Sequence, residues 1–318
     1  MKKKLKLKSL HFAVGALVIG AFLPIFIKND YYMMVLNRVL INIIVVLGLN
    51  FITGLTGQMN LGTAGIFALG AYSSALFTRY TNLTPWLGLI AAVIMGILIG
   101  RGLGYPSLRV RGVYLSLTTI GFGEVVRLLI SNTPKFTGGT QGIRNIRPYN
   151  IGSYQIQSQK EMYFFIAWRI AYSKWGRIFK SLRDNVEAVE MSGVDIASCK
   201  IKAFTVASIF GTVAGAMYAH YMGYINPSTF NLDLSTNYVV MLMVGGLGSV
   251  VGTIFGSAIV TILPEMLRFL GNYYQIVFCS IILLGAIFFP DGWVSAATGL
   301  FMKMYQRISG KSYAEGGE

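Results

Sequence analysis

Charged side chains are scarce in this sequence, and so are histidine and cysteine. Of its 318 residues 12% are charged, 12 are Asp or Glu, two are His and two are Cys, whereas 54% are hydrophobic. The mean hydropathy of +0.59 is far above that of a water-soluble domain of this length. The composition therefore indicates an integral membrane protein. Cys199 lies in a charged segment and Cys279 in an apolar run, so reduced thiols are expected rather than a disulfide.

The sequence also lacks the motifs of an enzyme. No loop combines a nucleophile, a base and an orienting group, so no catalytic residue is predicted. The chain has no Gly-x-x-x-x-Gly-Lys-Ser/Thr phosphate loop, so it is not expected to bind ATP by that route. His11 and His220 lie near opposite ends of different apolar runs, which predicts two membrane-interface residues and no metal site. Energy for any transport must come from a partner or from an ion gradient.

Long apolar runs are what the sequence does contain. A helix needs roughly 20 residues to cross a hydrocarbon layer of about 30 Å. The runs are continuous rather than alternating in polarity, so they predict helices and not a β-barrel. The expected fold is an all-α polytopic bundle with about 8–10 transmembrane or re-entrant helices. The runs are His11–Ile27, Met33–Thr53, Leu61–Thr78, Trp86–Gly100, Val113–Ser131, Ala203–Gly223 and Ile276–Pro290, with a glycine-broken pair across Tyr238–Leu263.

The 27 Lys and Arg residues, which give a net charge of +15, gather between the apolar runs. That distribution follows the positive-inside rule and argues against nucleic-acid binding. It predicts a cytoplasmic N-terminus, a cytoplasmic loop across Arg101–Arg111 and a cytoplasmic C-terminus. No small-x-small pattern follows Pro24, so the first helix is expected to stay uncleaved.

Counting the crossings exposes one weak point. A crossing has to lie between Glu161 and Lys174, but only Met162–Tyr172 is apolar, and eleven helical residues rise only about 16 Å. Either the adjacent residues are drawn into the membrane with their basic side chains reaching the interface, or residues are missing there. A single pass across Tyr238–Leu263 would leave the basic C-terminus outside. The count of crossings therefore favours two short passes or a re-entrant hairpin there, broken at Gly245, Gly246 and Gly248. Such irregular backbone survives in a membrane only where protein or water satisfies it.

The segment Lys174–Lys202 is charged and amphipathic, in contrast to its surroundings. Ser181 and Asp184 have the spacing of a capping box, and Gly193 can end the helix in a left-handed conformation. A helix this short needs a partner surface. Two interpretations stay open from the pattern: a docking helix for a soluble protein, or a solvated helix lying on the membrane.

Several passages resemble one known family. Glu187–Gly193 is similar to the Glu-Ala-Ala-x-x-x-Gly motif of permeases in ATP-binding-cassette importers, with Val189 in place of the second Ala. The passages 176–219, Gly54–Ala71, Pro106–Arg127 and Gly245–Gly256 resemble branched-chain amino-acid permeases of the LivM type. The likeness extends from about Asn42 to Phe289. Asn60 and Thr63 stand where many relatives have Ser and His.

The resemblance implies an importer permease bundle and a set of partners. These are a second permease of the LivH type, two cytoplasmic ATPases that bind ATP and Mg, and an extracytoplasmic amino-acid-binding protein. No cofactor is implied in this chain itself. The cytoplasmic helix would transmit ATPase closure to the membrane helices. Its coupling residues would be Ser181, Arg183, Asp184, Glu187, Ala188 and Gly193.

Small and polar residues in two apolar regions are candidates for the translocation path. They are Gln58, Asn60 and Gly62 in the first region and Gly245, Gly246 and Gly248 in the second. Ordinary helix packing is the alternative explanation. Glu124 and Arg127, spaced i, i+3, predict an intramembrane ion pair, either structural or part of a gate. Arg38, Asn42 and Asn50 could face the interior in the same way, with extension to the membrane interface as the alternative for Arg38.

These observations lead to one hypothesis and two rivals. Residues 1–318 form a single transmembrane permease domain with a cytoplasmic coupling segment at 174–202. It lies in the inner or plasma membrane of a prokaryote and imports branched-chain or similar hydrophobic amino acids by alternating access. The first rival is a permease of the same build for urea or short amides. The second is an autonomous secondary transporter, for which a cluster of intramembrane carboxylates would be required, whereas only Glu124 is clearly present.

Overall fold

The computed structural model describes residues 30–54, 56–110, 112–151, 154–155, 196–289 and 292–293. Within these ranges the chain is mostly helical, and five helical stretches are long and apolar enough to cross a membrane. They are Asp30–Gly54, Pro85–Arg109, Val113–Ser131, Lys200–Met222 and Val250–Gly271, and a shorter apolar helix covers Tyr274–Phe288. The predicted all-α polytopic fold is confirmed. The short run at 162–172 lies outside the described residues.

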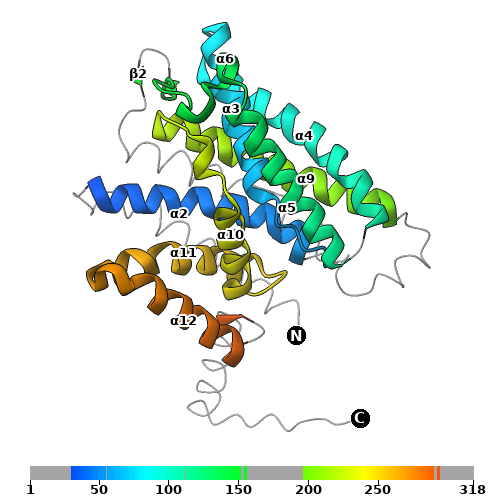
Figure 1. The fold of residues 1–318 in the computed structure, drawn as a ribbon, viewed down its shortest axis with the longest axis vertical. Coiled ribbons are helices and arrows are strands. Elements are labelled where there is room, and N and C mark those ends of the chain that lie inside the picture. Colours follow the sequence, from blue (N-terminus) through cyan, green and yellow to red (C-terminus); the bar gives the residue numbers. More distant parts are fainter. Residues whose placement is uncertain are drawn as a thin grey trace.

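The elements follow one another along the chain as Figure 1 shows. The long helices are α2 (Asp30–Leu49), α3 (Thr63–Thr81), α4 (Pro85–Arg109), α5 (Val113–Ser131), α9 (Ile196–Met222), α10 (Leu232–Gly245), α11 (Val250–Met266) and α12 (Tyr274–Phe288). A π-helical turn η1 (Asn50–Gly54) continues α2. Short elements are α6 (Pro134–Thr137), η2 (Gly139–Gln141), η5 (Pro227–Thr229), η6 (Leu267–Tyr273) and the paired strands β1 (Asn150–Ile151) and β2 (Tyr154–Gln155).

Helix α9 is the centre of the bundle and packs against α2, α3 and α4. Small residues make this packing close. On α4 every fourth residue from Gly88 to Gly104 is Gly or Ala, and a Cβ on Gly100 would meet the Thr205 Cα of α9 at 2.4 Å. A Cβ on Gly70 of α3 would meet the Thr212 carbonyl oxygen at 2.1 Å. Close backbone approach of this kind is how helices associate where water supplies no hydrophobic driving force.

Helix α2 is the most buried of the spanning helices, with core side chains such as Val45, Val46 and Leu49. It contacts α9 and α11. In Figure 1 helices α11 and α12 lie on one side of α2, and α3, α4 and α9 lie on the other. Helix α2 therefore joins the two halves of the described bundle.

The predicted loop across Arg101–Arg111 was wrong. Helix α4 continues without a break to Arg109, and only Val110–Gly112 separates it from α5. The reason is a contact with another helix. Helix α9 begins at Ile196, before the apolar part of its sequence. The Cα of Ile201 lies 3.3 Å from the position that a Cβ on Gly104 would take, so the two helices pack closely there. The C-terminal end of α4 and the N-terminal end of α9, both of which carry basic residues, thus stabilise each other's helical conformation beyond the apolar region.

Candidate functional site

The first candidate path region is an interruption between two helices. Helix α2 gives way to the π-helical turn η1, residues 57–62 are not helical, and α3 begins at Thr63. Gly57 has φ of +68°, a conformation that glycine adopts without the steric cost of a side chain. Single π-helical turns occur frequently at functional sites. The interruption contains Gln58, Asn60 and Gly62, which the sequence had singled out.

Hydrogen bonds to three other helices hold this irregular segment and the first turn of α3. The Leu61 amide donates to Thr119 Oγ1 of α5 at 3.0 Å, and the Ala64 amide donates to Ser235 Oγ of α10 at 2.9 Å. Gln58 Nε2 donates to the Ser107 carbonyl of α4 at 3.5 Å. The segment is therefore held by protein on all these sides, which is the condition for irregular backbone at membrane depth.

Asn60 and Gly62 shape the start of α3. Asn60 is buried, and its Oδ1 accepts the Gly62 amide at 2.8 Å. A Cβ on Gly62 would lie 2.4 Å from the Thr119 carbonyl oxygen, so α5 leaves no room for a side chain there. Thr63 is also buried, and within the described part of the chain its hydroxyl has no hydrogen-bond partner. The N-terminal end of α3 is thus polar and tightly enclosed.

The second candidate region is the turn between α10 and α11. Helix α10 ends at Gly245, and Gly246 and Gly248 take φ of +92° and +75°. Ser249 Oγ then caps α11 by accepting the Gly252 amide at 3.0 Å. A Cβ on Gly245 would meet the Gly252 carbonyl oxygen at 2.3 Å, so the two helices pack as a close hairpin. The predicted break of the Tyr238–Leu263 run at these glycines is confirmed.

Asn50 joins the two interruptions. Its Oδ1 accepts the Gly248 amide at 2.8 Å, and its Nδ2 donates to Thr253 Oγ1 at 3.1 Å. Asn50 is buried in η1, so one side chain links the π-helical turn, the glycine turn and the first turns of α11. A shift of either interruption would break hydrogen bonds to the other.

A second Asn–Thr contact extends the same seam. Asn42 Nδ2 of α2 donates to Thr261 Oγ1 of α11 at 3.0 Å. The Asn residues are eight apart and so are the Thr residues, which aligns both pairs along two antiparallel helices. Sequence reasoning had named Asn42 and Asn50 but missed Thr253 and Thr261. The matching eight-residue spacing was the available signal.

Glu124 and Arg127 lie on α5 and are paired. Arg127 Nε donates to Glu124 Oε2 at 2.9 Å, and a second bond joins the other guanidinium nitrogen and carboxylate oxygen. The pair is on the outer surface of the described bundle, with Glu124 exposed and Arg127 partly so. It therefore lies apart from the two interruptions.

His220 lies near the end of α9 and is buried in protein, and its predicted place at a membrane interface stays a prediction. Its Nδ1 lies 2.6 Å from the Arg147 carbonyl oxygen, which makes Nδ1 the donor and leaves Nε2 to accept from Ser74 Oγ at 2.8 Å. The ring packs on Tyr149 with centroids 4.9 Å apart. His220 thus ties α3 and α9 to the segment after η2. Among the described residues no three His, Cys, Asp or Glu side chains gather as a metal site.

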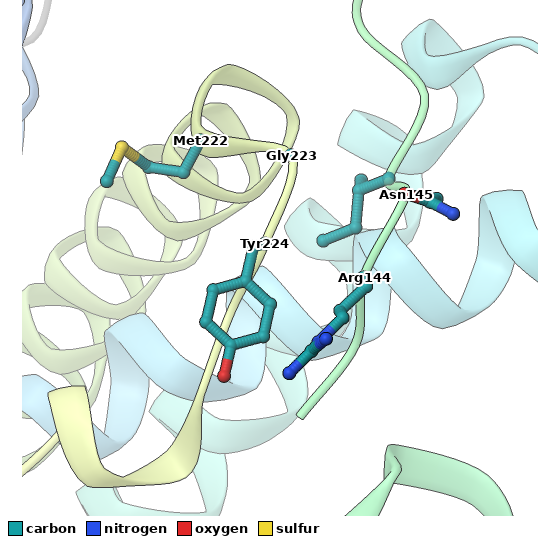
Figure 2. A pocket seen from close by; sticks show the side chains of 6 residues that line it. Arg144, Asn145, Met222, Gly223 and Tyr224 are labelled. Carbon is teal, nitrogen blue, oxygen red and sulfur yellow. The ribbon is translucent and has the colours of Figure 1, made fainter. Parts of the chain in front are cut away.

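An open pocket of about 610 Å³ lies beyond the end of α9. Figure 2 shows Arg144 and Tyr224 facing each other across it, and the Arg144 guanidinium carbon is 5.5 Å from the Tyr224 ring centroid. Its lining residues are Arg144, Asn145, Ile146, Met222, Gly223 and Tyr224. None of them belongs to either interruption, so this pocket is separate from the candidate path.

The predicted coupling residues lie in the segment 156–195, outside the described residues. For Ser181, Arg183, Asp184, Glu187, Ala188 and Gly193 the coupling role therefore stays a prediction. The first turns of α9, with Lys200 and Lys202, follow that segment directly.

Comparison with known proteins identifies the family to which this fold belongs. Residues 31–287 match the family described as the permease component of branched-chain amino acid transport systems. The chain belongs to this permease family. The match covers both interruptions and every helix of the permease from α3 to α11, so the candidate path lies within the family's common region.

Individual relatives support the assignment. The permease is 29% identical to the high-affinity branched-chain amino acid transport system permease protein LivM of Salmonella typhimurium, over 88% of this chain and 74% of the relative. A probable LivM of Methanocaldococcus jannaschii is 26% identical over 79% of this chain and 83% of the relative. The autoinducer 2 import system permease protein LsrC of Yersinia pseudotuberculosis is 23% identical over 89% and 84%. No solved structure matches the permease.

Proposed function

We propose that this permease forms the membrane path of an ATP-driven importer for branched-chain or similar hydrophobic amino acids. The path is bordered by residues 58–62 and 245–248 and opens alternately to the two sides of the membrane. The observation that carries the proposal is the hydrogen-bonded junction at Asn50, where two interrupted elements meet inside the bundle. Interrupted helices are the usual place for a transport site because their backbone groups can contact the solute.

The partners follow from the same proposal. A second permease of the LivH type completes the path, two cytoplasmic ATPases bind ATP and Mg, and an extracytoplasmic protein delivers the amino acid. The predicted helix 181–193 docks on an ATPase, which places segment 174–202 in the cytoplasm, and the positive-inside rule places the N- and C-termini there as well. The basic ends of α4 and α9, with Arg101, Arg109, Lys200 and Lys202, lie at one end of two packed helices. Their shared location agrees with the positive-inside rule.

Uptake by the assembled complex tests the solute. With the companion permease, the ATPases and the binding protein in proteoliposomes, labelled leucine is expected to accumulate with ATP and not with ADP. Unlabelled isoleucine and valine are expected to compete, whereas urea and autoinducer 2 are not. Autoinducer 2 is included because it appears in the name of the Yersinia relatives. Transport of urea alone would overturn the solute, and gradient-driven uptake by the isolated chain would overturn the ATP-driven class.

The coupling segment is tested by charge reversal. Glu187→Lys places a cation in the motif that resembles the ATPase-docking helix, and it is expected to abolish co-purification of the ATPase and ATP-dependent uptake. Ser192→Ala, in the same predicted helix but outside the proposed contact set, is the control and is expected to retain both. Undiminished assembly of the Glu187→Lys variant would show that this segment is not the docking helix.

A further inference from the structure

The N-terminal end of α3 contains a buried amide that lacks an acceptor. The first amides of any helix have no acceptor within the helix, so neighbouring groups have to supply one. In α3 such groups accept the amides of Gly62, Ala64 and Gly65. Among the described residues none accepts the amide of Thr63, which lies between them. One of the four amides at this helix end is therefore left free.

The Thr63 hydroxyl is a second free donor at the same place. Thr63 is 4% exposed, and its Oγ1 has no hydrogen-bond partner in the described part of the structure. Thr63 is the first residue of α3, and the Cα–Cβ bonds of a helix tilt toward its N-terminus. The hydroxyl is thus directed into the helix end beside the free amide. A buried polar group without a partner is costly, so this pair of donors indicates a ligand that binds during the transport cycle.

The chemistry of this helix end favours an anion. The N-terminus is the positive end of the α3 dipole, and anions bind at such ends. The first turn of α3 has no acidic residue, and Gly62 at the N-cap has no side chain with which to cap the helix. A carboxylate has two oxygens, which match the two donors of Thr63, and charged acceptors make the stronger hydrogen bonds. A water molecule would fill the site but has no charge to complement the dipole.

Ser235 of α10 closes the site in this conformation. Its hydroxyl is buried and accepts the Ala64 amide, next to Thr63, at 2.9 Å. The other end of α10 leads into the glycine turn that Asn50 binds. A displacement of α10 would therefore release the Ala64 amide and uncover the first turn of α3 in one movement.

We infer that the first turn of α3 binds the carboxylate of the transported amino acid. The Thr63 amide and hydroxyl donate to the carboxylate, and the Ala64 amide becomes a third donor when Ser235 moves away with α10. The inference rests on the proposed function, which supplies a solute with a carboxylate. Such a site would favour amino acids over neutral solutes such as urea.

Thr63→Val tests the site, because valine keeps the shape of threonine but removes the hydroxyl. In the complete complex in proteoliposomes, with saturating loaded binding protein, the maximal rate of leucine uptake is expected to fall at least about tenfold. Thermal unfolding in detergent is expected at the same or a higher temperature, since the variant removes an unpartnered buried hydroxyl. Thr63→Ser restores a hydroxyl and is expected to restore uptake.

Ser208→Ala is the matched control. Ser208 of α9 is fully buried, and within the described ranges its hydroxyl also has no partner. It belongs to neither interruption, so its removal is expected to leave leucine uptake unchanged. The comparison separates the loss of any unpartnered hydroxyl from the loss of the one at the α3 end.

Binding of labelled leucine measures recognition of the carboxylate directly. The detergent-purified complex of both permeases and the ATPases, without the binding protein, is expected to retain leucine. Excess unlabelled leucine is expected to displace it, whereas leucinamide, which has no carboxylate, is not. In Thr63→Val the retained leucine is expected to fall at least about tenfold.

Other outcomes would overturn the carboxylate site. These are unchanged uptake in Thr63→Val, equal losses of uptake in Ser208→Ala, a loss of uptake that accompanies a loss of thermal stability, equal displacement by leucinamide, or no retention of leucine by the original complex. Each of them leaves the importer function standing as long as the unmodified complete complex takes up leucine with ATP. Absence of that uptake would overturn the importer function itself.

Discussion

Replacing Asn50 with leucine is expected to abolish transport and to lower the free energy of unfolding. Leucine has a similar volume but leaves the partly buried Gly248 amide without its acceptor and removes the bond to the Thr253 hydroxyl, which keeps its bond to the Ser249 carbonyl. A buried donor without an acceptor costs about 1–3 kcal/mol. The junction between η1 and the glycine turn would separate, so we expect uptake to fall at least about tenfold, the factor that corresponds to 1.4 kcal/mol. Leucine uptake in proteoliposomes and thermal unfolding in detergent measure the two effects.

Asn42→Leu is the matched control for this variant. It removes the hydrogen bond to Thr261 on the same two helices but leaves the glycine turn untouched. Hydrogen bonds between membrane helices contribute on average about 0.6 kcal/mol, so Asn42→Leu is expected to transport and to unfold nearly as the original protein does. Equal losses in both variants would mean that Asn50 acts only as one more contact between α2 and α11.

Gly245→Ala is expected to have the second large effect. Its Cβ would lie 2.3 Å from the Gly252 carbonyl oxygen and 2.6 Å from the Gly252 carbonyl carbon. Both are backbone atoms, so a rotamer change cannot relieve the clash and α10 and α11 have to move apart. Overpacking typically costs about 1–3 kcal/mol. We expect reduced thermal stability together with loss of uptake, because the displaced hairpin contains the turn that Asn50 binds.

Gly102→Ala controls for the general effect of adding a methyl group to a helical glycine. Gly102 is exposed on α4, and nothing lies within 4 Å of its Cβ position. Alanine favours the helix by about 1 kcal/mol over glycine, so this variant is expected to be as stable as the original or slightly more so. If Gly245→Ala proved as harmless as Gly102→Ala, the hairpin could not be as closely packed as its geometry indicates.

Local pattern predicted the helices well where the environment is uniform. The Val113–Ser131 run coincides with α5, and Met33–Thr53 lies within Asp30–Gly54. The break between α10 and α11 was also predictable, because glycines at positive φ are a property of a few adjacent residues. The same holds for the Glu124–Arg127 pair, whose partners are one helical turn apart.

Contacts between distant segments were not predictable from the local pattern. The continuation of α4 to Arg109 depends on α9, and the burial of His220 depends on Ser74 and on the Arg147 carbonyl. A charged or polar residue near the end of an apolar run looks like an interface residue when its run is considered alone. Only the neighbouring helix decides whether it meets water, lipid or a hydrogen-bond partner.

The amino-acid sequence by itself determined that this protein is a helical membrane bundle, where most of its apolar helices lie, and that the Tyr238–Leu263 run breaks at its glycines, because hydropathy and glycine conformation are local properties. The tertiary structure alone decided that the two interruptions meet through Asn50, and that the Glu124–Arg127 pair lies on the outer surface of the described bundle. Asn50 and Gly248 are 198 residues apart. Their contact arises from the packing of α2 against α11, which no single segment encodes.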